Sequence, residues 1–306
     1  MPTRLPDRLR HRPFTTAEAL AAGVGRGVLA GPSVCRVFSG VYVSAGVDLD
    51  LRLRVEAALL VLPTPTAATS LTALWCWGVT IAREPHPLDL VTTHPHLVRR
   101  PGLVIRRVGR LPPTRGPWVS PEHAFVSAAR RLDLIDLVSA GDWLVRLRRC
   151  TPESLIAYAK TSREPGVALA RRAAHLVRRR VDSPRETRLR LCIVLTGLPE
   201  PRCNVTLGTD DRPIGRVDLL LEEFKLILEY EGDQHRIDPA QWNIDIGRAE
   251  AFGDEGYRVL RVTSAHLRSP RTLIKRIHRA MVAGGYSGPP PVFSPEWSSL
   301  FEGFVR

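Results

Sequence analysis

The sequence lacks the features that mark membrane-spanning, secreted and zinc-ribbon proteins. No apolar run reaches the ~20 residues that cross a bilayer, and the charged start, MPTRLPDRLRHRPF, contains no apolar signal core. The chain has five cysteines without a C-x-x-C pair: Cys35, Cys76, Cys150, Cys192 and Cys203. A sparse, odd set argues against a disulfide scaffold and against a zinc site built on paired cysteines. These absences predict a reduced, cytoplasmic protein that does not enter a membrane.

The chain carries an excess of positive charge, almost all of it from arginine. Its 306 residues include 44 Lys and Arg against 31 Asp and Glu, which gives a formal net charge of +13. Its 44% hydrophobic content is ordinary for a globular protein, and its length suffices for two or three domains. Because arginine binds phosphate with a bidentate fork, the excess favours a nucleic-acid partner. An Arg-rich proteome is the alternative explanation of the same excess.

The stretch with the most chemical information is RVDLLLEEFKLILEYEGDQH, residues 216–235, which predicts a β-hairpin. Alternation along each strand places apolar side chains, such as Leu219 and Leu228, on one face. The opposite face collects carboxylates, and a glycine after the second strand brings further polar groups close to them. The candidate catalytic residues of this stretch are Asp218, Glu229, Glu231, Gln234 and His235.

The spacing of these carboxylates predicts a metal site. A tight reversal at residues 222–223 would put Asp218 opposite Ile227. Glu229 would then be the diagonal neighbour of Asp218, roughly 7–8 Å away at the backbone. Carboxylates on one face repel each other unless a cation lies among them, so we expect Asp218 and Glu229 to bind Mg²⁺ or Mn²⁺. A solvated acidic sheet face is the alternative.

The motif D-x10-E-x-E-G-x-x-H, preceded by a helix with the sequence S-P-R-E-T-R-L-R, resembles the PD-(D/E)XK nuclease superfamily. The nearer likeness is to its branch of domains related to very-short-patch-repair endonucleases. The run D-x-x-R-x-x-x-F-x-x-x-G-Y-R-V-L-R-V-T, residues 245–263, fits the same branch. The resemblance extends over residues 180–285 and implies a mixed sheet flanked by helices.

This resemblance implies a Mg²⁺-dependent DNA endonuclease or nickase. Asp218 and Glu229 would hold the metal, and His235 would serve as general acid or base. Glu231 stands where the superfamily usually has lysine. Together with Gln234 it would orient the attacking water or support the leaving group.

Glu186, on the helix before the hairpin, has two explanations that the sequence leaves open. Ser183, Pro184 and Glu186 form a strong helix start, with a cap residue, a proline and the Glu of a capping box. In the resemblance, a Glu on this helix also reaches the metal site. Arginines around the hairpin are the expected phosphate contacts: Arg178, Arg179 and Arg180 before the helix, Arg216 at the hairpin, and Arg248 beyond it.

The first 48 residues predict a winged helix-turn-helix. Thr15 and Glu18 form a capping box, a second short helix covers residues 26–30, and a small hairpin turns at residues 39–40. Residues 14–45 resemble the winged domain of the abortive-infection type IV antitoxins. The resemblance and the element order imply that Arg26 and Arg36 contact DNA. Short Ala-rich helices without DNA are the alternative.

The predicted fold class is α+β, with five segments along the chain. A winged-helix domain covers residues 1–48, and residues 49–150 form a mixed α/β domain without a catalytic constellation. Residues 151–182 form an Arg-rich helical connector. The nuclease-like domain covers residues 183–285 in the order α-β-β-β-α-β-α, and residues 286–306 form a tail.

Two functions therefore follow from the sequence. The first is a metal-dependent DNA endonuclease or nickase of repair or defence. The second is a DNA-binding transcriptional regulator of the antitoxin kind, whose nuclease fold no longer cuts. RNA is an open alternative substrate, no small-molecule cofactor is indicated, and the sequence leaves open whether two copies pair as a homodimer.

Overall fold

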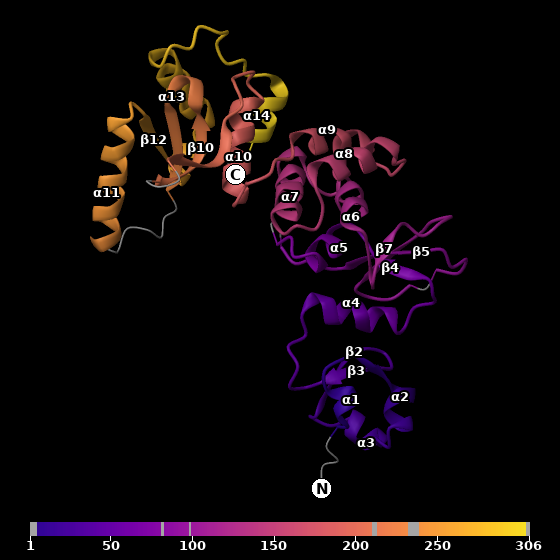
Figure 1. The fold of residues 1–306 in the computed structure, drawn as a ribbon. Helices are drawn as coiled ribbons and strands as arrows, with labels where there is room; N and C mark the ends of the chain where they lie inside the picture. Colours follow the sequence, from indigo (N-terminus) through magenta and orange to yellow (C-terminus); the bar gives the residue numbers. More distant parts are fainter. Residues whose placement is uncertain (1–4, 81–82, 98, 210–212, 232–238, 304–306) are drawn as a thin grey trace. The chain divides into compact units, whose positions relative to one another are not determined.

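The protein has an α+β fold in which helices surround three separate β-sheets (Figure 1). The computed structural model describes residues 5–80, 83–97, 99–209, 213–231 and 239–303, and of residues 239–246 the backbone alone. The chain divides into two compact units that interleave along the sequence. One comprises residues 1–131 and 153–171, and the other residues 132–152 and 172–306. Within the described ranges, no helix has both the length and the apolar character to span a membrane.

The N-terminal part of the first unit has short helices packed on a small sheet. Its elements are α1 (Asp7–Arg10), β1 (Phe14–Thr15), α2 (Thr16–Ala21), α3 (Arg26–Leu29), β2 (Val34–Phe38) and β3 (Val41–Ser44). The predicted capping box is confirmed, since Thr15 and Glu18 hydrogen-bond each other's backbone at the start of α2. The predicted hairpin is also present, with strands in the order β1-β3-β2. Phe14, Ala19 and Leu29 form the centre of its core.

A five-stranded sheet organises the rest of the first unit, with strand order β6-β5-β4-β8-β7. The elements are α4 (Leu51–Leu59), β4 (Thr66–Ala68), α5 (Ser70–Cys76), β5 (Leu88–Thr92), β6 (Leu103–Arg107), β7 (Thr114–Arg115), β8 (Trp118–Val119), α6 (Pro121–Ala128), α8 (Pro152–Thr161) and α9 (Val167–Leu176). Trp77 follows α5 and packs in the core, with its indole Nε1 donating to the Val119 carbonyl at 2.9 Å.

The second unit is built on a four-stranded sheet with strand order β12-β11-β10-β9. Its elements are α7 (Leu134–Arg146), α10 (Pro184–Val194), β9 (Arg202–Gly208), β10 (Pro213–Leu221), β11 (Leu226–Glu231), α11 (Pro239–Asp254), β12 (Arg258–Thr263), α12 (Ser264–Leu267), α13 (Pro270–Ala283) and α14 (Pro295–Phe301). Neighbouring strands are antiparallel except β11 and β12, which are parallel. The predicted order α-β-β-β-α-β-α is confirmed, with the single turn α12 added after β12.

The hairpin of β10 and β11 is buried on both faces near its turn. Leu219 and Leu228 lie on one face and are fully buried. Leu220 and Ile227 lie on the other face, where they join Phe252 of α11 in one apolar cluster. Helices α10 and α11 flank the strands on opposite sides (Figure 1). The acidic face is therefore confined to the end of the hairpin away from its turn.

The register of the hairpin differs from the sequence-based expectation. A 3-10 turn at Glu222–Phe224 and a left-handed Lys225, with φ of 49°, close the reversal. Leu221 therefore pairs with Leu226, and Leu219 with Leu228. Ile227 pairs with Leu220, so Asp218 does not lie opposite Ile227. Asp218 and Glu229 are instead the first residues of the two strands beyond the paired segment.

The C-terminal tail docks on the second unit through aromatic residues. Trp297 and Phe301 of α14 are buried, and the Trp297 indole Nε1 donates to the Cys192 carbonyl of α10 at 3.0 Å. Two guanidinium groups strengthen this contact, because Arg172 pairs with Glu296 and Arg271 with Glu302.

Candidate functional site

Three polar residues, Asn204, Asp218 and Glu229, lie on β9, β10 and β11 at the end of the hairpin where its buried apolar residues stop. Val217 pairs with Val205 and Leu219 with Cys203, so Asp218 has Asn204 of β9 as its register neighbour on one side. Glu229 is the first residue of β11 beyond the paired segment of the hairpin, and it lies close enough to Asp218 for the charge of Asp218 to raise its pKa. The three residues therefore lie on three adjacent strands at the same end of the sheet.

Asp218 is held in place by the backbone of the adjacent strand. The Tyr230 amide N–H donates to Asp218 Oδ2 at 2.8 Å. Burial raises the pKa of the Asp218 carboxyl, while this hydrogen bond and the nearby Arg216 and Arg248 guanidinium groups lower it. The balance leaves the pKa above its usual value. The nearby positive charges and the hydrogen bond therefore do not fully offset the effect of burial on the pKa of Asp218.

Glu229 pairs with Arg248, which extends from α11 toward the sheet. The two side chains are 18% and 31% exposed, so much of the pair is removed from water. Burial raises the pKa of Glu229, and the charge of Asp218 raises it further, against the lowering effect of Arg248. Arg248 therefore lies at the site, as predicted, and it does so by pairing with the Glu229 carboxylate.

A glycine makes room for this arginine. A Cβ added at Gly215 would lie 2.8 Å from Arg248 Cδ, which is closer than real Cβ contacts come. Any larger residue at this position would push the arginine away from Glu229. Gly215 is thus part of what positions Arg248, a role that its place in a turn-like sequence did not indicate.

Glu186 takes part in the start of α10 and also faces the site. Its carboxylate accepts hydrogen bonds from the Asp182 amide at 3.0 Å and the Ser183 hydroxyl at 2.8 Å. The Asn204 side-chain amide donates to the same carboxylate at 2.6 Å. Burial raises the pKa of Glu186, and the charge of Asp218 adds to that rise. The Ser183 cap is present, since its hydroxyl accepts from the Glu186 amide, but the predicted capping box is not closed, because the Glu186 carboxylate bonds the Asp182 amide and the Ser183 hydroxyl and not the Ser183 amide. Glu186 thus helps to fix the start of α10 and lies within electrostatic reach of Asp218.

Asn204 is a residue of the site that sequence reasoning missed. It has a left-handed backbone, with φ of 47°, inside strand β9, and its amide nitrogen also donates to the Arg180 carbonyl at 2.8 Å. Its Oδ1 atom is buried and accepts no hydrogen bond from any described residue. A buried amide oxygen without a donor is costly, so a cation or water at this point would be stabilising. An Asn inside a predicted strand was the only sequence signal, and it is a weak one.

Glu231 is separated from this group by its own partner. It pairs with Arg261 of β12 at 3.1 Å, and both side chains are about two-fifths exposed. Two further expected members, Gln234 and His235, lie outside the described residues. The structure therefore brings together Asp218, Glu229 and Glu186, and it places Glu231 in an exposed ion pair.

The expected phosphate-binding arginines divide into two groups. Arg216 pairs with Asp182 beside the site and remains more than half exposed. Arg178 instead pairs with Glu200 at 2.8 Å. The remaining two, Arg179 and Arg180, are exposed. Arg216 and Arg248 are thus the predicted contacts that the fold places at the carboxylates.

The arginine-rich sequence continues past the connector into α10, where Arg190 has a structural role. Arg190 of α10 is completely buried, and it pairs with Asp142 of α7 at 3.2 Å and with Glu200 at 2.9 Å. Thr187 donates to the same Asp142 carboxylate at 2.8 Å. An unpaired charge at such a position would be strongly destabilising, so this network joins α7 to α10. The density of arginine along the sequence therefore overstates the phosphate-binding surface.

The oxygen atoms at the site fit a divalent cation of the Mg²⁺ class. Asp218 and Glu229 offer carboxylates whose pKa is raised by burial, and Asn204 offers a buried amide oxygen without a donor. Mg²⁺ uses one or two such carboxylates and keeps several waters. Among the described residues, no group of three or more His, Cys, Asp or Glu side chains has the geometry of a metal site. A cation here would thus depend on two carboxylates, in competition with Arg248 for Glu229.

Comparison with known proteins gives distant relatives. No family model matches the chain. Two uncharacterized proteins of Mycobacterium tuberculosis, MT2308 of strain CDC 1551 / Oshkosh and Rv2248 of strain ATCC 25618 / H37Rv, are each 28% identical over 251 residues, which cover 80% of this chain and 91% of theirs. The crystal structure of the RV2827C protein from M. tuberculosis matches 65% of this chain and 80% of that one at 15% identity. Its TM-score of 0.38 is too low to support an argument.

Proposed function

We propose that the second unit hydrolyses phosphodiester bonds in DNA, as an endonuclease or nickase that uses Mg²⁺ or Mn²⁺ held by Asp218 and Glu229. The observation that carries the proposal is the register of the hairpin. The paired segment of the hairpin ends at Leu219 and Leu228, so Asp218 and Glu229 are the next residues on the two strands, and the charge of Asp218 raises the pKa of Glu229. Asn204, whose buried amide oxygen has no donor among the described residues, is the register neighbour of Asp218 on β9. The resemblance to PD-(D/E)XK nucleases supports the same assignment.

The side chains around the carboxylates have separate tasks in this proposal. Arg248 and Arg216 bind the phosphate next to the scissile bond, because a guanidinium has five N–H donors and one ion pair leaves several of them for a ligand. Glu186, fixed by three hydrogen bonds, keeps Asn204 oriented toward the site. The cation, when bound, lowers the pKa of a coordinated water and neutralises charge on the phosphate.

The first unit supplies DNA binding in this proposal. The order α2, α3, β2, β3 is that of a winged helix-turn-helix, in which the second helix enters the major groove. Arg26 begins α3 and is exposed, which suits a contact with the DNA backbone or a base edge. The cytoplasm, where DNA is accessible, is the compartment that fits this function.

A DNA-binding regulator of the antitoxin kind is the second candidate, and one observation favours it. Arg248 neutralises Glu229, and Arg261 neutralises Glu231, so two of the hairpin's three carboxylates have a counter-charge without a metal. In this candidate the nuclease fold is retained as a scaffold, and binding by the winged region is the whole function. The two candidates differ in whether phosphodiester cleavage occurs at all.

Cleavage of supercoiled plasmid separates the two candidates. Wild type, Asp218→Asn and the control Glu222→Gln are incubated with Mg²⁺, Mn²⁺ or EDTA. Glu222 lies at the turn of the same hairpin, where it pairs with Arg202, so the control removes the same charge away from the site. We expect metal-dependent nicking by wild type and Glu222→Gln and none by Asp218→Asn. Equal cleavage by Asp218→Asn would refute the assignment of the site.

The regulator candidate makes a different prediction for the same preparations. It expects metal-independent binding of a specific DNA duplex, without cleavage in any metal. That binding should weaken in Arg26→Ala and remain unchanged in Asp218→Asn. Gel-shift titration of the full-length chains in EDTA measures both effects. Cleavage that disappears with Asp218 would exclude this candidate as the complete function.

A further inference from the structure

The first unit contains a pocket that joins Arg36, a predicted DNA contact, to residues that neither proposed function uses. Its volume is about 610 Å³, and it lies between the β2–β3 hairpin, the start of α4 and the loops that precede β5 and β6. This volume falls in the range of about 300–1,000 Å³ that is usual for small-molecule sites. The pocket is lined by Arg36, Val37, Phe38, Ser39, Leu49, Arg54, His86, Leu88, Arg100, Pro101 and Gly102.

The charged lining of the pocket is entirely positive. Three arginines, Arg36, Arg54 and Arg100, come from separate segments of the chain, and no Asp or Glu is among the lining residues. Glu84, outside the lining, neutralises Arg54 alone. Arginines gathered in this way repel each other and favour an anionic ligand.

Two of these guanidinium groups also have unused donors. The Nε atoms of Arg54 and Arg100 are buried and have no hydrogen-bond acceptor among the described residues. A buried donor without an acceptor costs free energy of about 1–3 kcal/mol. An oxygen-rich anion in the pocket would supply acceptors to such groups. The unsatisfied donors are therefore a second sign of a ligand, independent of the net charge.

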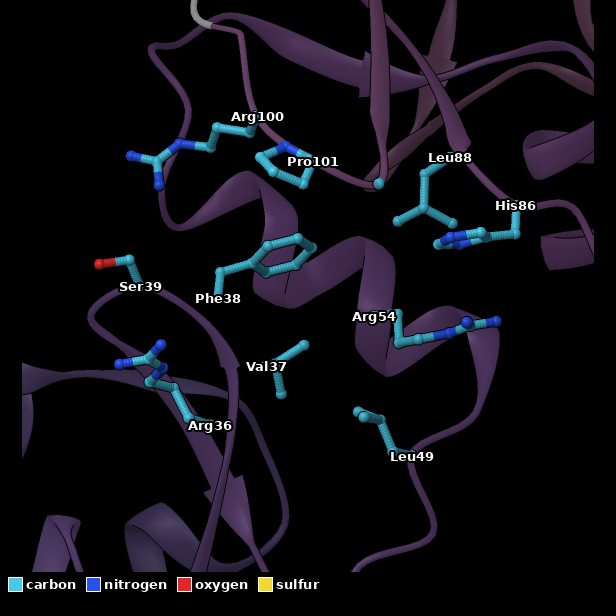
Figure 2. Close-up of a pocket in the computed structure, with 11 residues that line it drawn as sticks. Arg36, Val37, Phe38, Ser39, Leu49, Arg54, His86, Leu88, Arg100 and Pro101 are labelled. Carbon is cyan, nitrogen blue, oxygen red and sulfur yellow. The ribbon is translucent and has the colours of Figure 1, made fainter.

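The rest of the lining is apolar and includes an aromatic ring. Figure 2 shows Phe38 between two groups of side chains, with Arg36, Ser39 and Arg100 on one side and Leu88 with His86 on the other. Inorganic phosphate alone would leave this apolar surface in contact with water. A ligand with both a phosphate group and a flat ring would cover both kinds of surface, because bases stack on aromatic side chains.

We propose that this pocket binds a nucleoside monophosphate unit. Its phosphate lies at Arg36 and Arg100, with the Ser39 hydroxyl nearby, and its base lies against Phe38. The unit is either a free mononucleotide or one nucleotide of a single strand, since both present the same phosphate and base. Binding at this place would join the hairpin that ends β2 to the loops before β5 and β6, all within one compact unit.

Calorimetric titration of the full chain tests the proposal. The probes are AMP, GMP, CMP and UMP, a single-stranded oligonucleotide of mixed sequence, inorganic phosphate, and benzoate as an aromatic carboxylate. We expect one mononucleotide or the oligonucleotide to bind more tightly than phosphate and benzoate. Binding of free mononucleotide would identify a soluble ligand, and binding of the oligonucleotide alone would identify a strand.

Substitutions of the pocket arginines test whether the nucleotide binds in this pocket. Arg36→Ala and Arg100→Ala should each weaken nucleotide binding about tenfold or more, because a charge-assisted hydrogen bond is lost. Arg110→Ala removes the same charge from an exposed position of the same unit outside the pocket and should bind like wild type. Arg36 is exposed, so its variant is expected to fold.

Three results would overturn the proposal. The first is binding to Arg36→Ala and Arg100→Ala that equals binding to wild type. The second is binding of inorganic phosphate or benzoate as tightly as any nucleotide. The third is the absence of binding by every mononucleotide and by the oligonucleotide at millimolar concentration.

Discussion

Arg248 of α11 forms an ion pair with Glu229 of β11, at the place where the carboxylate row of the hairpin needs a positive charge. Asp218 lies beside Glu229, and its negative charge raises the pKa of Glu229. The guanidinium thus does part of what a divalent cation would do at this site. The two proposed functions assign Arg248 different roles. In the endonuclease it binds phosphate next to a metal ion, and in the regulator it takes the place of the metal ion as the counter-charge of Glu229.

The first prediction concerns this ion pair. Arg248→Ala should lower the free energy of unfolding by about 1–3 kcal/mol, because the largely buried Glu229 carboxylate loses its counter-charge. Glu229→Gln in the same background should recover part of the loss, since a neutral amide needs no counter-charge. Urea unfolding of wild type, both single variants and the double variant measures the coupling. Additive effects in that cycle would contradict the pair.

The second prediction concerns the space that Gly215 leaves for Arg248. Gly215→Ala should lower the stability of the protein for two reasons: the added Cβ would lie 2.8 Å from Arg248 Cδ, and alanine fits poorly at a φ of 156°. Gly215→Ala in the Arg248→Ala background keeps the backbone cost and removes the contact, so the substitution should cost less there than in wild type. Gly247→Ala is a control for a glycine substitution inside α11, since a Cβ added there meets no described atom within 4 Å, and it should stabilise the protein by about 0.5–1 kcal/mol. An equal cost of Gly215→Ala in both backgrounds, measured by thermal unfolding, would argue against the close contact.

The third prediction concerns Asn204. Its amide satisfies the buried Glu186 carboxylate and the Arg180 carbonyl, so Asn204→Ala should cost about 2–4 kcal/mol of stability. Part of that cost comes from the left-handed backbone, which alanine tolerates poorly. Asn204→Gly keeps the backbone and loses only the amide, so it should cost less than Asn204→Ala. Chemical unfolding of the two variants separates the contributions, and equal costs would show that the backbone conformation is unimportant.

The fourth prediction concerns the pH dependence of stability through His123 of α6. Burial lowers the pKa of His123 from 6.5 to about 4, and Arg106 contributes to the lowering. The imidazole Nδ1 hydrogen-bonds the Tyr158 hydroxyl at 2.9 Å, and Nε2 is buried without a partner among the described residues. Between pH 6.5 and pH 4 the unfolded chain therefore binds a proton that the folded chain does not. The stability from this group is complete above pH 6.5 and is lost as the pH falls toward 4.

The measurement for His123 is a comparison with His123→Gln, which does not titrate. The difference in free energy of unfolding between the two proteins should change by about 3 kcal/mol between pH 7 and pH 4, to the disadvantage of wild type. Carboxylates common to both proteins cancel in the difference. A difference that stays constant over this range would mean that His123 is accessible to protons in the folded state.

What the sequence determined by itself is the local structure. The capping box at Thr15 and Glu18, the proline-led start of α10 and the order of elements in the second unit all follow from contacts between residues a few positions apart. Alternation of side chains likewise placed Asp218 and Glu229 on one face of a hairpin. Such features depend on backbone geometry and on caps, which neighbouring residues supply.

Tertiary structure decided which charges meet. Nothing in the sequence distinguishes Arg190, which is buried against Asp142, from Arg216, which stays exposed beside the site. The turn that closes the hairpin shifted the register, so that Ile227 pairs with Leu220 and Asp218 and Glu229 are the first residues beyond the paired segment. Packing of α11 then brought Arg248 to Glu229, and Gly215 leaves space for the arginine side chain because it has no Cβ. Which charged residues form ion pairs over long sequence distances depends on how the helices and strands pack and on the free-energy cost of burying an unpaired charge. A sequence pattern predicts neither the packing nor this cost.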